Sequence, residues 1–217
     1  MKSATFLTSL LSVWLASAAT IPVPALQLVA RADNTTENQL SGPCRLVTFI
    51  FARGTDEDGN VGTIVGPPLI ADLRAALGVD GIAAQGVDYD ASILGYLEGG
   101  SPSGITTMVG LINTAASQCP ATKIVIGGYS QGAQLVHKAA LQLSATVTAR
   151  IAAVVMFGDP ERVGKTTPPA VGTVNPAIVD SVCHVNDIIC TGEGGATQHL
   201  NYGEDAPAAS AFIVALV

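Results

Sequence analysis

The stretch Lys123-Ile-Val-Ile-Gly-Gly-Tyr-Ser130-Gln-Gly-Ala-Gln134 decides the fold. Its β-branched residues 124–126 predict a buried strand, which breaks at two glycines, and a helical pattern follows Ser130. Residues 128–132 fit the pattern G-x-S-x-G, which is typical of a tight strand-to-helix turn that holds a serine hydroxyl above a sheet. The hydroxyl then lies at the positive end of a helix dipole. We therefore predict that Ser130 is a nucleophile.

On both sides of this turn, short apolar runs alternate with helical patterns, which favours a mostly parallel sheet covered on both faces. We expect a single-domain α/β fold with a central five-stranded sheet and helices on both faces. No segment is left over for a lid, so a site at the carboxyl ends of the strands is expected to be open to solvent. The expected strands are 46–52, 82–87, 123–127, 151–157 and 178–185, the expected helices are 67–77, 103–117, 131–143 and 206–217, and 161–176 is expected to be a loop.

The composition suits one soluble domain with a substantial core. The chain has 217 residues, of which 48% are hydrophobic and only 12% are charged. Its formal net charge of −7 argues against nucleic acid or an anionic membrane as a partner. We expect a monomer with no nucleic-acid or membrane partner.

The N-terminus has the pattern of a targeting segment. Lys2 precedes an apolar stretch, residues 4–19, and the small residues 16–18 offer a cleavage site. We predict a signal peptide over 1–18, a pro-segment or flexible lead-in over 19–31, and the folded domain over 32–217. No other segment approaches 18 unbroken apolar residues, so secretion without membrane insertion is expected.

The cysteine count also suggests an extracellular protein, since four cysteines in a secreted chain suggest two disulfides. Three pairings are possible. The short spacing of Cys183 and Cys190 favours a local bond between them, which leaves Cys44 to pair with Cys119. A metal site is not expected, because there is no C-x-x-C and only His184 lies next to a cysteine.

A serine needs a general base, and the chain offers three histidines. His137 lies seven residues along the helix after Ser130, which places it about 10 Å away and out of hydrogen-bond reach. His184 lies inside the last expected strand and next to Cys183. His199 lies in a polar, glycine-rich stretch before the closing helix, from which its ring can reach the sheet edge. We therefore predict that His199 is the base, ahead of His184.

The base in turn needs an acid, which precedes the histidine in chain order in this type of site. Asp159 follows a strand, but Asp159-Pro160 is also a common turn starter. Asp187 lies between Cys183 and Cys190, where a small disulfide loop would hold its carboxylate rigidly. Because orientation is what the acid supplies, we favour Asp187 over Asp159.

Two groups are expected to form an oxyanion hole. One is the backbone N–H of Gln131, the residue after the nucleophile. The other is Thr55, whose N–H and hydroxyl can both donate from the loop after the first strand, although a plain turn remains an alternative for residues 53–55.

Together these motifs resemble those of the fungal cutinases, from about Cys44 to the C-terminus. The matching elements are the elbow around Ser130, the Ala52-Arg-Gly-Thr55 loop, the Cys183-x-x-x-Asp187-x-x-Cys190 segment and His199-Leu-x-Tyr-Gly203. The resemblance implies a lidless α/β-hydrolase, secreted to cleave cutin, the polyester of the plant cuticle.

The resemblance also implies triad roles for Ser130, Asp187 and His199, the disulfides Cys44–Cys119 and Cys183–Cys190, and no cofactor or metal. Thr55 stands where the family usually has a serine, so the hydroxyl is kept.

One segment departs from the family pattern. Residues 192–198 carry none of the bulky aliphatic side chains that usually grip an acyl chain, whereas Ile93 and Leu94 are expected to line the groove from the opposite side. Because each lost aliphatic contact weakens chain binding, we expect short acyl groups (about C2 to C6) to be preferred.

Two other functions fit parts of the sequence. An acetylxylan esterase would share the serine elbow but usually has more cysteines, so the count of four favours a cutinase. A non-catalytic secreted surface or carbohydrate-binding protein would share only the scaffold, and the retained serine, aspartate and histidine argue against it.

Overall fold

The computed structural model describes Met1 and residues 34–217. The predictions of a signal peptide over 1–18 and of a lead-in over 19–31 rest on residues outside the described ones. Within the described residues, no helix is both long and apolar enough to span a lipid bilayer.

The core of the fold is a parallel five-stranded sheet, as the sequence predicts. The strand order is β2-β1-β3-β4-β5. The strands are β1 (Val47–Ala52), β2 (Ile82–Gly86), β3 (Lys123–Tyr129), β4 (Ile151–Phe157) and β5 (Val179–Val182).

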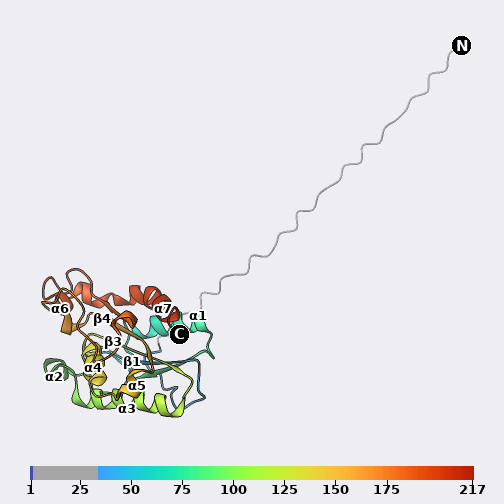
Figure 1. Ribbon diagram of the computed structural model, residues 1–217. Coiled ribbons are helices and arrows are strands. Elements are labelled where there is room, and N and C mark those ends of the chain that lie inside the picture. The colour runs from blue at the N-terminus through green and yellow to red at the C-terminus, as the bar shows by residue number, and fades with distance from the viewer. Residues whose placement is uncertain (2–33) are drawn as a thin grey trace. The chain divides into compact units, whose positions relative to one another are not determined.

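Alternate residues of each strand point to opposite faces of the sheet and form two cores. Ile50 and Ile126 belong to one core, with the helices α3 and α4, and Phe49 and Phe51 belong to the other, with α1 and α7. Figure 1 shows α1 and α7 on one side of the sheet and α3, α4 and α5 on the other. The longer helices are α1 (Gly66–Leu77), α3 (Pro102–Gln118), α4 (Gln131–Ala140) and α7 (Ala206–Val214).

Short helices are the main difference from the sequence prediction. Three one-turn α-helices were not expected: α2 (Ile93–Leu97), α5 (Ala145–Thr148) and α6 (Ile188–Thr191). Each is capped at its start by a side chain that accepts a hydrogen bond from a backbone N–H of the first turn, and the three capping residues are Ser92, Ser144 and Asp187 respectively. Segments this short show no hydrophobic period, so only their caps mark them. The part of the chain that the structure describes also contains four 3₁₀ turns: η1 (Pro160–Arg162), η2 (Pro176–Ile178), η3 (Thr197–Leu200) and η4 (Tyr202–Asp205).

The last strand is shorter than predicted, and this corrects the placement of His184. β5 ends at Val182, so His184 lies beyond the strand rather than inside it. The physical reason is that the His184 backbone N–H donates to the Tyr202 hydroxyl, at 2.9 Å, and not to a neighbouring strand. The helix expected over 131–143 likewise ends earlier, at Ala140.

Both expected disulfides are present. Cys44 is bonded to Cys119, and Cys183 is bonded to Cys190 across a separation of seven residues. The second bond closes the loop from which α6 begins.

The strand order fixes where a site can form. From β1 the chain crosses to β2 on one side and then returns to β3 on the other, so the order reverses between β1 and β3. At such a switch point the loops leaving the two strands diverge and open a crevice at the carboxyl end of the sheet. Thr55 follows β1 and Ser130 follows β3, and both lie at this end.

Candidate active site

The turn at Ser130 is strained in the way the sequence pattern predicts. Ser130 has φ 55° and ψ −119°, a region that non-glycine residues rarely occupy. Its backbone N–H donates to the Phe157 carbonyl at 2.9 Å, which ties the turn to the adjacent strand β4. The strain is held by the surrounding sheet, and it presents the hydroxyl at the N-terminus of α4.

Two glycines make this turn sterically possible. A Cβ at Gly128 would lie 2.3 Å from the Gly132 carbonyl carbon, and a Cβ at Gly132 would lie 2.0 Å from the Ala52 carbonyl oxygen. Neither position has room for a side chain, because strand and helix backbones touch there. The two flanking glycines of G-x-S-x-G are therefore required by the packing of α4 against β1 and β3.

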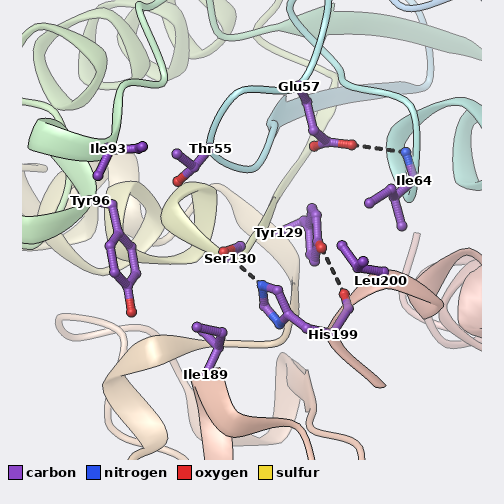
Figure 2. Close-up of a pocket in the computed structure, with 10 residues that line it drawn as sticks. All are labelled: Thr55, Glu57, Ile64, Ile93, Tyr96, Tyr129, Ser130, Ile189, His199 and Leu200. Carbon is purple, nitrogen blue, oxygen red and sulfur yellow. Dashed lines mark hydrogen bonds between the residues drawn. The ribbon is translucent and has the colours of Figure 1, made fainter. Parts of the chain in front are cut away.

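His199 lies against Ser130. Its Nε2 lies 2.9 Å from Ser130 Oγ, and its side chain is largely buried. The dashed line between the two side chains in Figure 2 marks this bond. A Cβ at Gly158 would lie 2.6 Å from His199 Cε1, so only glycine leaves room for the ring. The Tyr129 hydroxyl donates to the His199 carbonyl at 2.7 Å and fixes the backbone behind the ring. Burial raises the pKa of Tyr129, and the charges of Glu57 and Asp187 add to this, so the phenol stays a donor.

Asp187 lies on the far side of the imidazole. His199 Nδ1 donates to its Oδ2 at 2.9 Å, and the Ile189 backbone N–H donates to its Oδ1 at 2.8 Å. The carboxylate is fully buried, and it caps α6 within the loop that the Cys183–Cys190 disulfide closes. A buried charge needs such donors on both oxygens. Ser130, His199 and Asp187 thus form a continuous hydrogen-bonded line.

The loop after β1 faces the same serine. The Gln131 side-chain amide donates to Thr55 Oγ1 at 2.8 Å and to the Ser92 carbonyl at 2.9 Å. Because that amide NH₂ donates to Thr55 Oγ1, the Thr55 hydroxyl proton is free to point toward the pocket. The Gln131 backbone N–H opens α4 and has no acceptor within the helix. Both predicted oxyanion donors therefore lie beside Ser130.

Glu57 holds this loop in place, a contact that sequence reasoning missed. One of its carboxylate oxygens accepts from the Gly54 N–H at 2.6 Å, and the other accepts from the N–H groups of Thr63 and Ile64 at 2.8 and 2.9 Å. Figure 2 shows the Glu57 carboxylate reaching the Ile64 segment. The only sequence signal was an acidic residue two positions after Thr55.

Comparison with known proteins places this site in a family. The family model described as "Cutinase" matches residues 43–217. A cutinase of Blumeria hordei is 51% identical over 183 residues, which cover 83% of this chain and 75% of the relative. A cutinase of Botryotinia fuckeliana is 48% identical over 78% of this chain and 82% of its own. The chain belongs to the cutinase family.

The solved structures agree with this assignment. A Trichoderma reesei cutinase bound to a phosphonate inhibitor superposes with a TM-score of 0.76 at 43% identity, over 85% of this chain and 80% of that chain. An acetylxylan esterase superposes with a TM-score of 0.68 at 25% identity, over 80% of this chain and 99% of that one. The protein is therefore a carboxylic ester hydrolase with the α/β-hydrolase fold.

In this protein Ser130 and His199 line a cavity of about 250 Å³. Its apolar lining comes from five different segments of the chain, and only Ile93 was expected from the sequence. Leu94 was also expected there, but it is exposed and is not among the lining residues. The physical reason is that successive side chains of a helix leave its axis about 100° apart. The aliphatic and aromatic side chains of the lining are Ile64, Ile93, Tyr96, Tyr129, Ile189 and Leu200.

The two histidines that sequence reasoning set aside as bases, His137 and His184, each pair with an aspartate. His137, in α4, is bonded to Asp159 at 3.0 Å from Nε2 to Oδ2. His184 is bonded to Asp205 at 2.7 Å. Within residues 34–217, no group of three or more His, Cys, Asp or Glu side chains is placed to hold a metal ion.

Proposed function

We propose that this protein is a secreted serine esterase that hydrolyses the ester bonds of cutin and of soluble short-chain esters. One observation carries the proposal: the line from Ser130 Oγ through His199 to Asp187, with both hydrogen bonds at 2.9 Å. A serine hydroxyl is a weak nucleophile without an adjacent, oriented base, and this line supplies one.

The chemistry follows from the protons. Since Asp187 accepts from His199 Nδ1–H, Nε2 carries a lone pair that faces the Ser130 hydroxyl. As Ser130 Oγ attacks the ester carbonyl carbon, its proton passes to Nε2, and the imidazolium then gives that proton to the leaving alcohol. Water, deprotonated by the same nitrogen, cleaves the acyl-enzyme and regenerates the serine.

The carbonyl oxygen becomes an anion in the tetrahedral intermediate. Its donors in this proposal are the backbone N–H groups of Gln131 and Thr55 and the Thr55 hydroxyl. The Gln131 side chain and Glu57 hold this loop before the substrate arrives. Preorganised donors of this kind act without further reorganisation during the reaction.

The cavity supports a preference for short acyl groups. At about 250 Å³ it lies below the range of about 300–1,000 Å³ common for small-molecule sites. Its rim is open, since Ile93 and Leu200 are each about 60% exposed. An open rim suits an insoluble polyester, whose chain continues beyond the site.

Secretion is part of the same proposal. Two disulfides are typical of proteins that fold in an oxidising compartment. The apolar N-terminal pattern of the sequence points the same way. Recovery of a processed, disulfide-bonded chain from the culture medium of an expressing host would test this.

The function is tested by hydrolysis of cutin, tributyrin and acetylated xylan, with Ser130→Ala as the control. We expect release of hydroxy fatty acids and butyrate by the wild type, and no activity of the variant above background. Acetylxylan esterase is the second candidate, because its structure superposes over most of this chain. Acetate release from xylan without attack on cutin would favour that candidate instead.

Two further measurements bound the proposal. A fluorophosphonate should label the wild type at Ser130, and failure to label the folded protein would favour a non-catalytic role. Turnover of nitrophenyl butyrate should exceed that of nitrophenyl palmitate, and the reverse order would contradict the short-acyl preference.

A further inference from the structure

Tyr202 lies behind the proposed triad and makes no contact with the substrate cavity. It belongs to η4, three residues after His199, and its side chain is fully buried. It is not among the residues that line the cavity. Any effect of Tyr202 on the reaction must therefore pass through another residue.

That residue is Asp187. The Tyr202 hydroxyl donates to Asp187 Oδ2 at 2.6 Å, the shortest of the hydrogen bonds to this carboxylate. The same oxygen accepts from His199 Nδ1–H. The phenol and the imidazole thus share one carboxylate oxygen, and the Tyr202 ring meets the His199 ring edge-on.

The backbone of His184 determines which way the Tyr202 hydroxyl proton points. The His184 backbone N–H, which can only donate, points at the Tyr202 oxygen at 2.9 Å. The one hydroxyl proton is therefore directed to Asp187. Burial raises the pKa of Tyr202, and the bond to Asp187 raises it further, so the phenol remains protonated across the working range.

The phenol is itself clamped. The His184 ring stacks on the Tyr202 ring with centroids 4.1 Å apart. His184 is held in turn by Asp205 at 2.7 Å and by the Gln198 carbonyl at 3.0 Å. The His184–Asp205 pair therefore fixes the position of the tyrosine ring. A side chain must itself be fixed in this way in order to orient another.

We propose that Tyr202 is a positioning residue of the reaction, which holds Asp187 Oδ2 in line with His199 Nδ1. This inference rests on the triad of the proposed function. Without the hydroxyl, Asp187 keeps the Ile189 N–H and the imidazole as donors, but no second donor fixes the angle at which its Oδ2 meets the ring. The charge that remains is also shared among fewer donors and holds the protonated imidazole more tightly.

The test is Tyr202→Phe, which keeps the ring and its stacking and removes one oxygen. We expect kcat to fall about 10- to 100-fold, the effect of one hydrogen bond to a charged group, with KM nearly unchanged. The acid limb of the pH–rate profile should move to higher pH, because the imidazolium is held more tightly.

The matched control is Tyr89→Phe, which removes another buried hydroxyl that donates to a backbone carbonyl, that of Arg53, at 2.6 Å. Both variants should unfold at somewhat lower temperature than the wild type, but only Tyr202→Phe should move the pH profile. Equal kinetic effects of the two variants would show that the phenol acts through stability alone.

A double-mutant cycle separates this inference from the proposed function. In an Asp187→Asn background, Tyr202→Phe should lower kcat little further, because its target is already altered. An unchanged kcat and pH profile in Tyr202→Phe, with Ser130→Ala inactive, would overturn the role of Tyr202 alone. Full activity of Ser130→Ala would overturn the triad itself.

Discussion

The molecule contains two buried histidine–aspartate pairs that are almost identical as pairs. In one, His199 Nδ1 lies 2.9 Å from Asp187 Oδ2, and in the other His137 Nε2 lies 3.0 Å from Asp159 Oδ2. Both aspartates are fully buried, and both histidines are less than a tenth exposed. Neither distance nor burial distinguishes the proposed active pair from the other one.

The difference lies at the second ring nitrogen. His199 Nε2 faces Ser130 Oγ at 2.9 Å, a group with a proton to give. His137 Nδ1 faces the Ala170 carbonyl at 3.3 Å, which can only accept. A histidine between two acceptors has no neighbouring group that can give it a proton, so it only links the two acceptors by hydrogen bonds. A histidine between an acceptor and a hydroxyl can act as a base.

The difference between the two pairs is tested most strongly by replacing each histidine, His199 and His137, by glutamine. His199→Gln should lower kcat on the order of 10⁶-fold, as the loss of a triad base does. His137→Gln should keep kcat within a few-fold of the wild type, because no reacting group lies near it. Initial rates on nitrophenyl butyrate measure both variants, and a comparable loss in the two would show that the second pair is also part of the reaction.

A smaller loss is expected at Thr55, which shares the cavity with Ser130 and His199. Thr55→Val keeps the shape and removes the hydroxyl, and should lower kcat by about 10²–10³-fold, the usual effect of one oxyanion donor. Thr55→Ser is the matched variant and should keep most of the activity. If valine were as active as serine at this position, the hydroxyl would have no part in the oxyanion hole.

The His137–Asp159 pair should affect the free energy of unfolding rather than the rate of the reaction. In His137→Gln the imidazole nitrogen that contacts Asp159 is lost, and of the native donors to this buried carboxylate the Glu161 N–H, at 2.9 Å, remains. Removing a donor from a buried carboxylate should lower the free energy of unfolding by about 1–3 kcal/mol. Urea unfolding of His137→Gln and of His137→Gln/Asp159→Asn measures it, and the double variant should recover part of the loss because its buried side chain is neutral.

Much of the sheet, and the choice of the candidate site residues, can be predicted from the sequence. The apolar runs that became β1, β3 and β4 are long enough to show their period, and G-x-S-x-G identifies the turn at Ser130. Chain order and the spacing of the cysteines select Asp187 and His199. These inferences depend on neighbours along the chain, which a sequence displays directly.

The remaining features depend on contacts between distant segments. Tyr202 reaches Asp187 across 15 residues, through a path set by η3 and η4. Ile189 and Leu200 enter the cavity only because α6 and η3 are brought to the same site as α2, about 90 residues earlier in the chain. His184 was placed in a strand because its apolar neighbours continue the pattern, whereas its backbone N–H is bonded to Tyr202. No local period encodes such pairings.

The third pair, His184–Asp205, should give the smallest effect, and one that depends on pH. Burial lowers the pKa of His184, but the Gln198 carbonyl and the Asp205 carboxylate together raise it above its usual value. Its contribution to stability is therefore complete below about pH 6.5, the unfolded value, and is lost as the pH rises through the higher folded value. His184→Gln should lower Tm by about 2 °C near pH 5.5 and by less near pH 8.5. Asp205→Asn should show the same pH dependence, because either change removes the ion pair. A Tm difference that stays constant across this range in both variants would mean that the pair contributes through packing on Tyr202 and not through charge.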